Sequence, residues 1–425
     1  MSLAANQKLL RSINAKTVLA IAKSNHPISR IEIARLSGLS QAAVSRIVDS
    51  LIERQILFEA SVSGILRSVG RQPVMLDFNP TAGYVLAVEI GRVGQRIALT
   101  DLNGTIVATH QVQADVRLDK DDILAQILAE SERLILEVGL HQSQLVGIGV
   151  TITGLVDAAR GVVRTFRADW DNTNLKGVFE RRFSAPTYVE GDTKAITIAE
   201  QHLGAGNGKR DQVCICFTDA GPSAGIIHND HLVRGVTDSA GEVGSITAGY
   251  LIKEKSLLRS LYPPDADLTF DQLLRKDVPH EMLHLHLSTS GDPWQSPPKN
   301  RPLQFTNVYV AEAAAKGDPI SRAVLTEYGE LVAILCLNVI NFLNPERIIL
   351  HGDIFWTNDF VLEVVRHAVQ RHVLTIPAKA VSIVPSVLRE DAVLLGAASL
   401  VLRDLFSRPE VRRVSQGRKL QFYTS

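Results

Sequence analysis

The sequence predicts a mixed α/β protein in which a small helical unit with a terminal hairpin precedes a larger body. Three observations support this fold class. The chain has 425 residues, which corresponds to about two to four domains. Its hydrophobic content of 45% and charged content of 21% are ordinary for a globular protein and exclude disorder over most of the length. From Gly83 onward, buried-strand patterns alternate with amphipathic helical patterns.

Charge is distributed unevenly along the chain, although 45 Lys and Arg residues balance 45 Asp and Glu residues. Ten basic and five acidic residues lie within 1–77, so this segment carries +5 and the rest of the chain carries −5. A basic head on an acidic body indicates a small anion-binding module joined to a separate unit.

The small number of cysteines indicates a reducing compartment, and the apolar runs indicate no membrane segment. The three cysteines support neither a disulfide framework nor a four-thiolate zinc site, and Cys214 and Cys216 are expected on one face of a strand. The N-terminus lacks an apolar signal core. The longest apolar run, 331–343, is shorter than the ~20 residues that span a bilayer, and it predicts a core helix. We expect a cytoplasmic protein without a membrane segment.

The first unit has the order helix, turn, helix, hairpin. Apolar residues over 18–22 predict a first helix that ends near Ser24. Ser29 and Glu32 form a capping-box pattern that starts the second helix. After the turn at Gly38, Ser40 is the expected N-cap of a third helix with one apolar stripe over 44–52. Two short strands, 56–60 and 72–78, then enclose a basic loop. This order is typical of a winged helix-turn-helix.

The third helix leaves short and hydrogen-bonding side chains outside its apolar stripe, and these can enter a DNA major groove. The hairpin loop adds cations that can reach phosphate or a minor groove. The expected DNA contacts are Ser40, Gln41, Ala42, Ser45 and Arg46 from the helix, with Arg67 and Arg71 from the loop. The alternative is a small helical domain with a solvated polar face.

The body contains two blocks in which strands precede helices, which indicates two related lobes around a cleft. The expected strands are 84–90, 96–101, from 106, 145–152, 187–189, 213–217, 225–228, 347–351 and 380–385. The expected helices are 121–138, 193–203, 309–316, 319–343, 360–373 and 392–406. Segment 262–304 is expected to be an irregular insertion or flap. We expect domains at 1–80, 81–190 and 191–390, followed by a C-terminal helix and basic tail at 391–425.

Several motifs together resemble the ROK family, named for repressors, open reading frames and kinases. They are Gly70-Arg71-Gln72-Pro73, Thr153-Gly154-Leu155-Val156-Asp157, Gly191-Asp192-Thr193-Lys194, Ala240-Gly241-Glu242-Val243-Gly244-Ser245, Asn344-Pro345-Glu346-Arg347 and Leu394-Leu395-Gly396-Ala397-Ala398. The resemblance implies a two-lobed, actin-like or sugar-kinase-like (ribonuclease H-like) body. Family members with a winged helix are sugar-responsive transcription regulators, and members without one are sugar kinases.

The resemblance also implies a ligand site at Gly154, Asp192, Lys194, Glu242 and Ser245. Asp192 stands at the family's catalytic base, and Glu242 at its sugar-contacting glutamate. The alternative for Asp192 is an N-cap of the following helix, and for Glu242 a turn residue paired with a cation. Lys194 replaces an asparagine, so it can neutralise Asp192 or bind an acidic or phosphorylated ligand.

Departures from the family pattern argue against enzymatic activity and against metal. Three segments that bind nucleotide in kinases are altered here: Gly91-Arg92-Val93-Gly94, Asp219-Ala220-Gly221-Pro222-Ser223 and His351-Gly352-Asp353. Ser245 replaces the zinc-binding histidine, and the family's cysteines do not follow it. His280 and His284 are expected at i, i+4 on a helix and match a metalloprotease spacing, but a packed or solvated histidine face explains them better. We expect no cofactor.

The sequence therefore predicts a DNA-binding transcription regulator, expected to be a repressor of carbohydrate metabolism. Its expected partners are a double-stranded DNA operator and a sugar or sugar phosphate effector in the lobe cleft, with a homodimer or homotetramer as the assembly. The alternatives are a sugar kinase that uses Asp192 as its base, and a regulator controlled by a protein partner without a small ligand. The basic tail either contacts DNA or a subunit, or is solvated.

Overall fold

The computed structural model describes residues 3–60, 74–92, 94–113, 119–165, 168–252, 256–263, 266–290, 306–357 and 359–406. The predicted hairpin cations Arg67 and Arg71 lie outside these ranges, as does the basic tail beyond Phe406.

In its described residues, the N-terminal unit contains three helices, α1 (Leu3–Asn25), α2 (Arg30–Ser37) and α3 (Gln41–Glu53). The predicted helix starts are confirmed, because Ser29 accepts a hydrogen bond from the Glu32 amide and Ser40 accepts one from the Ala43 amide. Gly38 ends α2 with a φ of +69°, which favours glycine. Strands β1 (Ile28–Ser29), β3 (Met75–Phe78) and β2 (Leu57–Ala60) form a sheet in that order.

The first body sheet has the order β10-β7-β4-β5-β6. Its strands are β4 (Tyr84–Ile90), β5 (Gly94–Asp101), β6 (Ile106–Gln113), β7 (Leu145–Ile152) and β10 (Thr187–Gly191). Strands β4, β5 and β6 pair antiparallel, whereas β7 and β10 extend the sheet in parallel from β4. Helices α4 (Lys120–Glu137) and α5 (Leu175–Phe183) pack with this sheet, and β8 (Leu155–Asp157) pairs with β9 (Val162–Thr165).

The second sheet, β13-β12-β11-β14-β15, repeats the topology of the first. Its strands are β11 (Gln212–Thr218), β12 (Gly221–His228), β13 (His231–Leu232), β14 (Arg347–His351) and β15 (Ser382–Pro385). In chain order both sheets read 3-2-1-4-5, with an antiparallel three-strand meander followed by two parallel strands. The prediction of two related lobes is confirmed.

The helices of the second lobe include the long α10 (Pro319–Leu343) with α9 (Thr306–Ala315), α11 (Asp353–Thr357) and α12 (Phe360–His372). Among the described residues, α10 is the one helix long and apolar enough to cross a membrane. Most of its apolar side chains are buried in the core of the second lobe, so the prediction of a core helix is confirmed.

Two predictions for the second lobe are wrong. Segment 262–304 is not irregular throughout, because it contains α7 (Phe270–Leu273) and α8 (Val278–Ser290). Val278, Met282 and Leu283 bury one face of α8, and the interspersed histidines had obscured this pattern. In addition, Ala380 ends a helix, α13 (Thr375–Ala380), instead of starting β15.

Short 3-10 helices connect several of these elements. They are Pro80–Ala82, Gln142–Gln144, Ala168–Trp170, Val243–Ser245, Gly249–Leu251, Leu258–Leu261 and Arg389–Asp391.

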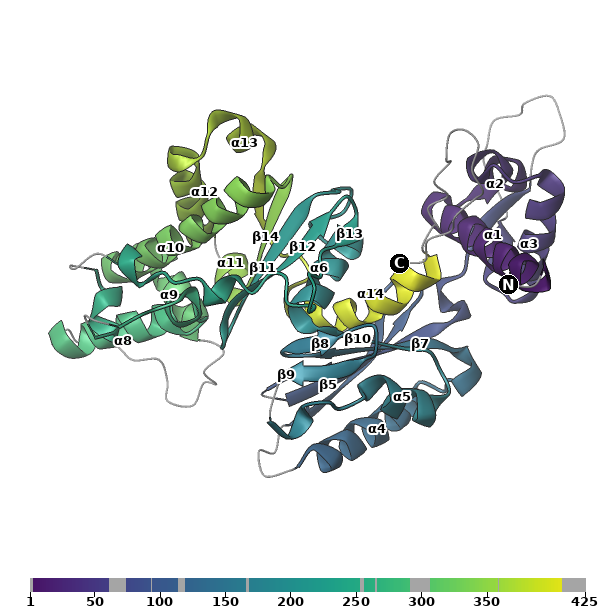
Figure 1. Cartoon of the computed structure of the whole chain (residues 1–425), viewed down its shortest axis with the longest axis horizontal. Helices are drawn as coiled ribbons and strands as arrows, with labels where there is room; N and C mark the ends of the chain where they lie inside the picture. The colour runs from purple at the N-terminus through teal and green to yellow at the C-terminus, as the bar shows by residue number, and fades with distance from the viewer. Residues whose placement is uncertain are drawn as a thin grey trace.

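Helices α6 (Asp192–Leu203) and α14 (Ala392–Phe406) lie between the major units (Figure 1). Helix α14 packs along α6 and across β7, and its far end reaches α1 of the N-terminal unit. The approach is close because Gly149 of β7 faces Ala397, and a Cβ at position 149 would lie 1.8 Å from the Ala397 carbonyl oxygen. The last helix of the described residues is therefore part of the central packing of the molecule.

Candidate functional site

Asp192 is the first residue of α6 and directly follows β10. Its Oδ1 accepts a hydrogen bond from the Thr193 backbone N–H at 2.7 Å. Burial raises the pKa of Asp192, while hydrogen bonds from Thr193 and Thr153 and the charge of Lys194 oppose this shift. The alternative that Asp192 is the helix N-cap is wrong, because Gly191 occupies that position. The carboxylate is thus held at a helix N-terminus, where the helix dipole favours negative charge.

The start of α6 is tied to the second lobe through its next two residues. Thr193 Oγ1 lies 2.5 Å from Ser223 Oγ on β12. The Lys194 side chain is buried, and its Nζ donates to the Asp238 carbonyl oxygen at 2.7 Å. The first contact joins the Asp192 segment to β12, and the second joins it to the loop between β13 and Glu242.

Glu242 lies close enough to interact electrostatically with Asp192 and Lys194. Partial burial raises the pKa of Glu242, and the charges of Asp271 and Asp192 add to this, while Lys194 opposes it. Three of the predicted ligand residues therefore converge. The site combines two carboxylates and one ammonium, which suits a ligand rich in hydroxyl groups, because a hydroxyl can donate to a carboxylate and accept from an ammonium.

An ion pair between the partly exposed Arg234 and the buried Glu190 fixes the loop that precedes Glu242. Arg234 Nη2 lies 2.6 Å from Oε2 of Glu190, and its Nη1 donates to Asp238 Oδ1 at 2.9 Å. The Glu190 side chain is almost completely buried at the end of β10, so this pair bridges the first sheet and a loop of the second lobe. Sequence reasoning did not identify Arg234 or Glu190, because their partnership depends on the lobes meeting.

The remaining predicted ligand positions lie at the margins of this cluster. Gly154 follows β7 with a φ of +122°. Its carbonyl oxygen lies 2.9 Å from where a Cβ on Gly191 would stand, so a side chain at position 191 would collide with it. Ser245 is exposed at the end of a 3-10 turn. Gly154 therefore lies in close contact with the residue before Asp192, which requires glycine at position 191, and Ser245 lies on the surface.

Of the three segments that the family resemblance aligns with a nucleotide site, two contain paired or buried carboxylates. Asp219 forms an ion pair with Lys276 at 2.8 Å. Asp353 has a raised pKa because of burial, and the charge of Asp219 adds to this shift. In the turn between β4 and β5, the Gly91 amide donates to the Gly94 carbonyl oxygen at 3.1 Å, so this amide already has a partner. Two of the three segments therefore place a carboxylate where a nucleotide phosphate would need positive charge.

The exposed face of α3 carries most of the predicted DNA contacts. Gln41, Ala42 and Arg46 are exposed, whereas Ser45 is partly exposed. The Ser40 hydroxyl oxygen caps the helix by accepting a hydrogen bond from the Ala43 backbone N–H at 3.3 Å. Buried Val44, Val48 and Leu51 hold the opposite face against α1 and α2. The helix thus presents a continuous polar surface from its N-terminus.

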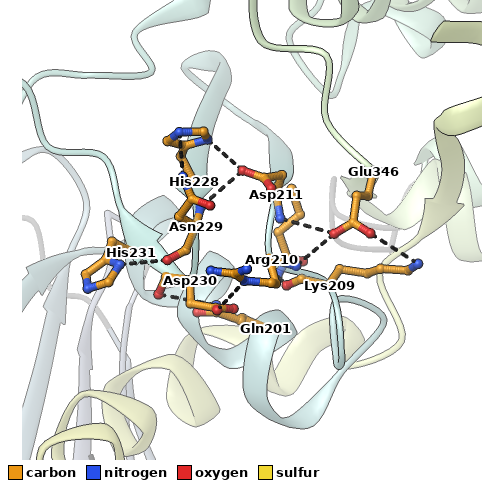
Figure 2. Close-up of polar contacts among 10 residues, drawn as sticks. Gln201, Lys209, Arg210, Asp211, His228, Asn229, Asp230, His231 and Glu346 are labelled. Atoms are coloured by element: carbon orange, nitrogen blue, oxygen red, sulfur yellow. Dashed lines mark hydrogen bonds and ion pairs between the residues drawn. The ribbon is translucent and has the colours of Figure 1, made fainter. Parts of the chain in front are cut away.

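A second polar cluster surrounds the turn between β12 and β13 (Figure 2). Asn229 and Asp230 form the turn with positive φ values of 49° and 68°. Arg210 Nε donates to Asp230 Oδ2 at 2.9 Å, and Glu346 accepts from the amides of Arg210 and Asp211 at 2.9 and 3.3 Å. Because these groups satisfy one another, we assign the cluster a bracing role between the starts of β11 and β14.

Comparison with known proteins agrees with this architecture. The model of the ROK family matches residues 85–263 and 288–404. A xylose repressor from Bacillus spizizenii is 26% identical over 415 residues, which cover 94% of this chain and 97% of the repressor.

Two solved structures show the same fold. A ROK family transcriptional regulator, described as a homologue of the Escherichia coli Mlc protein, superposes with a TM-score of 0.76 at 23% identity, covering 93% of this chain and 98% of that chain. A ROK family glucokinase from Streptomyces griseus, in complex with glucose and AMPPNP, superposes with a TM-score of 0.59 at 22% identity, covering 75% of this chain and 99% of the kinase.

Proposed function

Because the chain belongs to the ROK family, we propose that it is a DNA-binding transcriptional repressor of carbohydrate metabolism, controlled by a sugar or sugar-derived effector bound near Asp192 and Glu242. One observation carries the proposal. The xylose repressor aligns with 94% of this chain, whereas the glucokinase has no counterpart for about a quarter of it. This difference in coverage, together with a family match that begins at residue 85, supports an N-terminal unit that repressors have in addition to the kinase-like body.

DNA recognition is proposed for the N-terminal unit, which we assign as a winged helix-turn-helix. Helix α3 enters the major groove with Gln41, Ala42, Ser45 and Arg46, and Ser40 places the first amides of the helix near a phosphate. Arg67 and Arg71 reach the backbone or a minor groove from the hairpin. Two heads of a homodimer, or of each half of a homotetramer, read half-sites about one helical turn or a multiple apart.

Effector recognition is proposed for the cluster at the start of α6. Asp192 and Glu242 accept hydrogen bonds from sugar hydroxyls, while Lys194 holds the Glu242 loop and supplies a cation beside both carboxylates. Gly154 and Ser245 line the edges of this site. The name of the xylose repressor suggests D-xylose as the first sugar to test. We propose that the protein acts in the cytoplasm, where both the DNA and the sugar are available.

Operator binding tests the proposal directly. A duplex is selected from a random library with the wild-type protein, and its affinity is measured by fluorescence anisotropy for Arg46→Ala. Loss of one base contact weakens binding about 5- to 150-fold, whereas Arg133→Ala on the body surface removes the same charge and leaves the affinity unchanged. Selection of no duplex, or equal affinities for both variants, refutes the DNA-binding assignment.

Kinase activity is the competing proposal, because Asp192 is retained at the position of the catalytic base. The charge of Asp219 and the buried carboxyl of Asp353 argue against a bound triphosphate. A coupled assay of ATP consumption over a panel of sugars separates the two functions. We expect no turnover above background, and turnover that Asp192→Asn abolishes would make the protein a kinase.

A further inference from the structure

The N-terminal unit is fastened to the body around the side chain of Lys23 on α1. Its Nζ lies 3.8 Å from the ring centroid of Phe406, the last residue of α14, and 5.8 Å from the ring centroid of Phe78 on β3. The two rings meet edge to face with centroids 5.8 Å apart. The same ammonium donates to the Leu102 carbonyl oxygen in the turn between β5 and β6 at 2.5 Å. Three units of structure thus converge on one cation.

This contact depends on the positive charge of Lys23. Burial lowers the pKa of Lys23 to about 8, and the charge of Asp101 opposes this shift. The Lys23 ammonium is therefore predominantly charged at pH 7. A desolvated ammonium over an aromatic face is held more strongly than one at an exposed site. Two turns earlier on the same face of α1, Lys16 pairs with Asp404 and donates to its carbonyl oxygen, but this contact is largely solvated, and solvated ion pairs contribute little.

The other end of α14 lies against the helix that carries Asp192. A Cβ at Gly396 would stand 2.7 Å from the Ala195 carbonyl carbon, so α14 and α6 approach almost backbone to backbone. On its other side α14 meets β7, where a Cβ at Gly147 would lie 2.6 Å from Val401. Contacts this close leave little freedom for α14 to move independently of α6, because packed cores shift between discrete arrangements instead of deforming continuously.

We propose that α14 is the element through which the Asp192 site controls the DNA-binding unit, and that the Lys23–Phe406 contact is its coupling point. A shift of α6 on effector binding moves α14, and Phe406 passes this movement to α1 through the ammonium. The inference rests on the proposed function and specifies its regulation. It assigns Lys23 a positioning role, since the side chain lies on neither the DNA face nor the effector site.

The experiment separates coupling from binding. Lys23→Met keeps an unbranched side chain of similar length and removes the positive charge. Phe406→Leu keeps an apolar side chain and removes the aromatic ring. Lys209→Met is the matched control, because it makes the same substitution at a lysine that pairs with Glu346 in the bracing cluster and has no hydrogen bond or ion pair to the described residues of α1. For each variant, the affinity for the selected duplex is measured with and without saturating D-xylose, and D-xylose binding is measured by calorimetry.

Wild type and Lys209→Met are expected to lose at least about fivefold in duplex affinity when D-xylose is present. Lys23→Met and Phe406→Leu are expected to bind both ligands, with the sugar changing duplex affinity less than about twofold. Unaltered sugar dependence in both junction variants overturns the inference and leaves the proposed function intact. Selection of no duplex by wild type overturns the proposed function, and this regulation with it.

A second measurement needs no sugar. Spin labels are attached at Arg54→Cys on the N-terminal unit and at Asp121→Cys on the first lobe. Pulsed electron paramagnetic resonance then reports the distribution of distances between the two labels. Native cysteines are buried and do not compete for label. The distribution is expected to broaden in Lys23→Met and Phe406→Leu relative to Lys209→Met. Identical distributions in all variants would show that the contact does not hold the head, which overturns the inference.

Discussion

The closest approach between α14 and the first sheet gives the sharpest prediction for stability. In Gly149→Ala, the new Cβ would lie 1.8 Å from the Ala397 carbonyl oxygen and 2.4 Å from its carbonyl carbon. Ordinary contact requires the strand and helix to separate by about 1.5 Å, and neither backbone can swing aside. Overpacking of this kind costs about 3 kcal/mol. At about 2–4 °C per kcal/mol for domains of this size, we expect Tm to fall by about 6–12 °C.

Thermal unfolding followed by far-ultraviolet circular dichroism measures this change. Gly352→Ala is the matched control, because its new Cβ would meet nothing nearer than Phe217 at 3.4 Å, which is ordinary contact. We expect the Tm of the control to lie within about 3 °C of wild type. If Gly149→Ala melts as wild type does, α14 does not lie against β7 as described, and the argument for its coupling role fails with it.

Three further predictions concern the cap of α3, the interlobe ion pair and a buried histidine. Ser40→Ala removes the bond to the Ala43 amide and should destabilise the N-terminal unit by about 1 kcal/mol in urea unfolding, whereas unchanged stability refutes the cap. Arg234→Met leaves the Glu190 carboxylate buried without its ion pair, so we expect a loss of about 3 kcal/mol, and a loss below about 1 kcal/mol contradicts burial of the pair. Burial lowers the pKa of His351 to about 4, so between pH 6.5 and 4 the unfolded chain binds more protons than the folded protein. The free energy of unfolding should therefore decrease as the pH is lowered through this window, by up to about 1.4 kcal/mol per pH unit. Burial also lowers the pKa of His202 to about 4, so His351→Gln should reduce this slope without abolishing it, and an identical profile in the variant would show that His351 does not contribute.

Elements with strong local patterns were predictable from the sequence. The strands 84–90, 145–152 and 347–351 are near-continuous apolar runs, and their bounds agree with the structure. Ser29 and Ser40 were identified because capping depends on residues three positions apart. In contrast, helical spacing at α8 was recognised only for His280 and His284, and the extent of the helix was missed because its histidines interrupt the apolar face that Val278, Met282 and Leu283 form.

The connections between units could not be read from local patterns. Lys194 was interpreted as a ligand-binding or neutralising cation, and its bond to the Asp238 carbonyl joins residues 44 positions apart. The contact between Lys23 and Phe406 joins the two ends of the described chain. The proximity of Asp192 and Glu242 was expected from the family resemblance alone, because neither charge pattern nor periodicity brings distant loops together.

The most direct test of the account is the effect of a sugar on operator affinity of the wild-type protein. Fluorescence anisotropy with the selected duplex is recorded over a D-xylose titration, and calorimetry determines the sugar concentration at which the protein is saturated. The account predicts that the dissociation constant of the duplex rises at least about fivefold as the sugar saturates. A duplex affinity that stays constant while the sugar is fully bound would contradict the claim that one ligand site controls the DNA-binding unit.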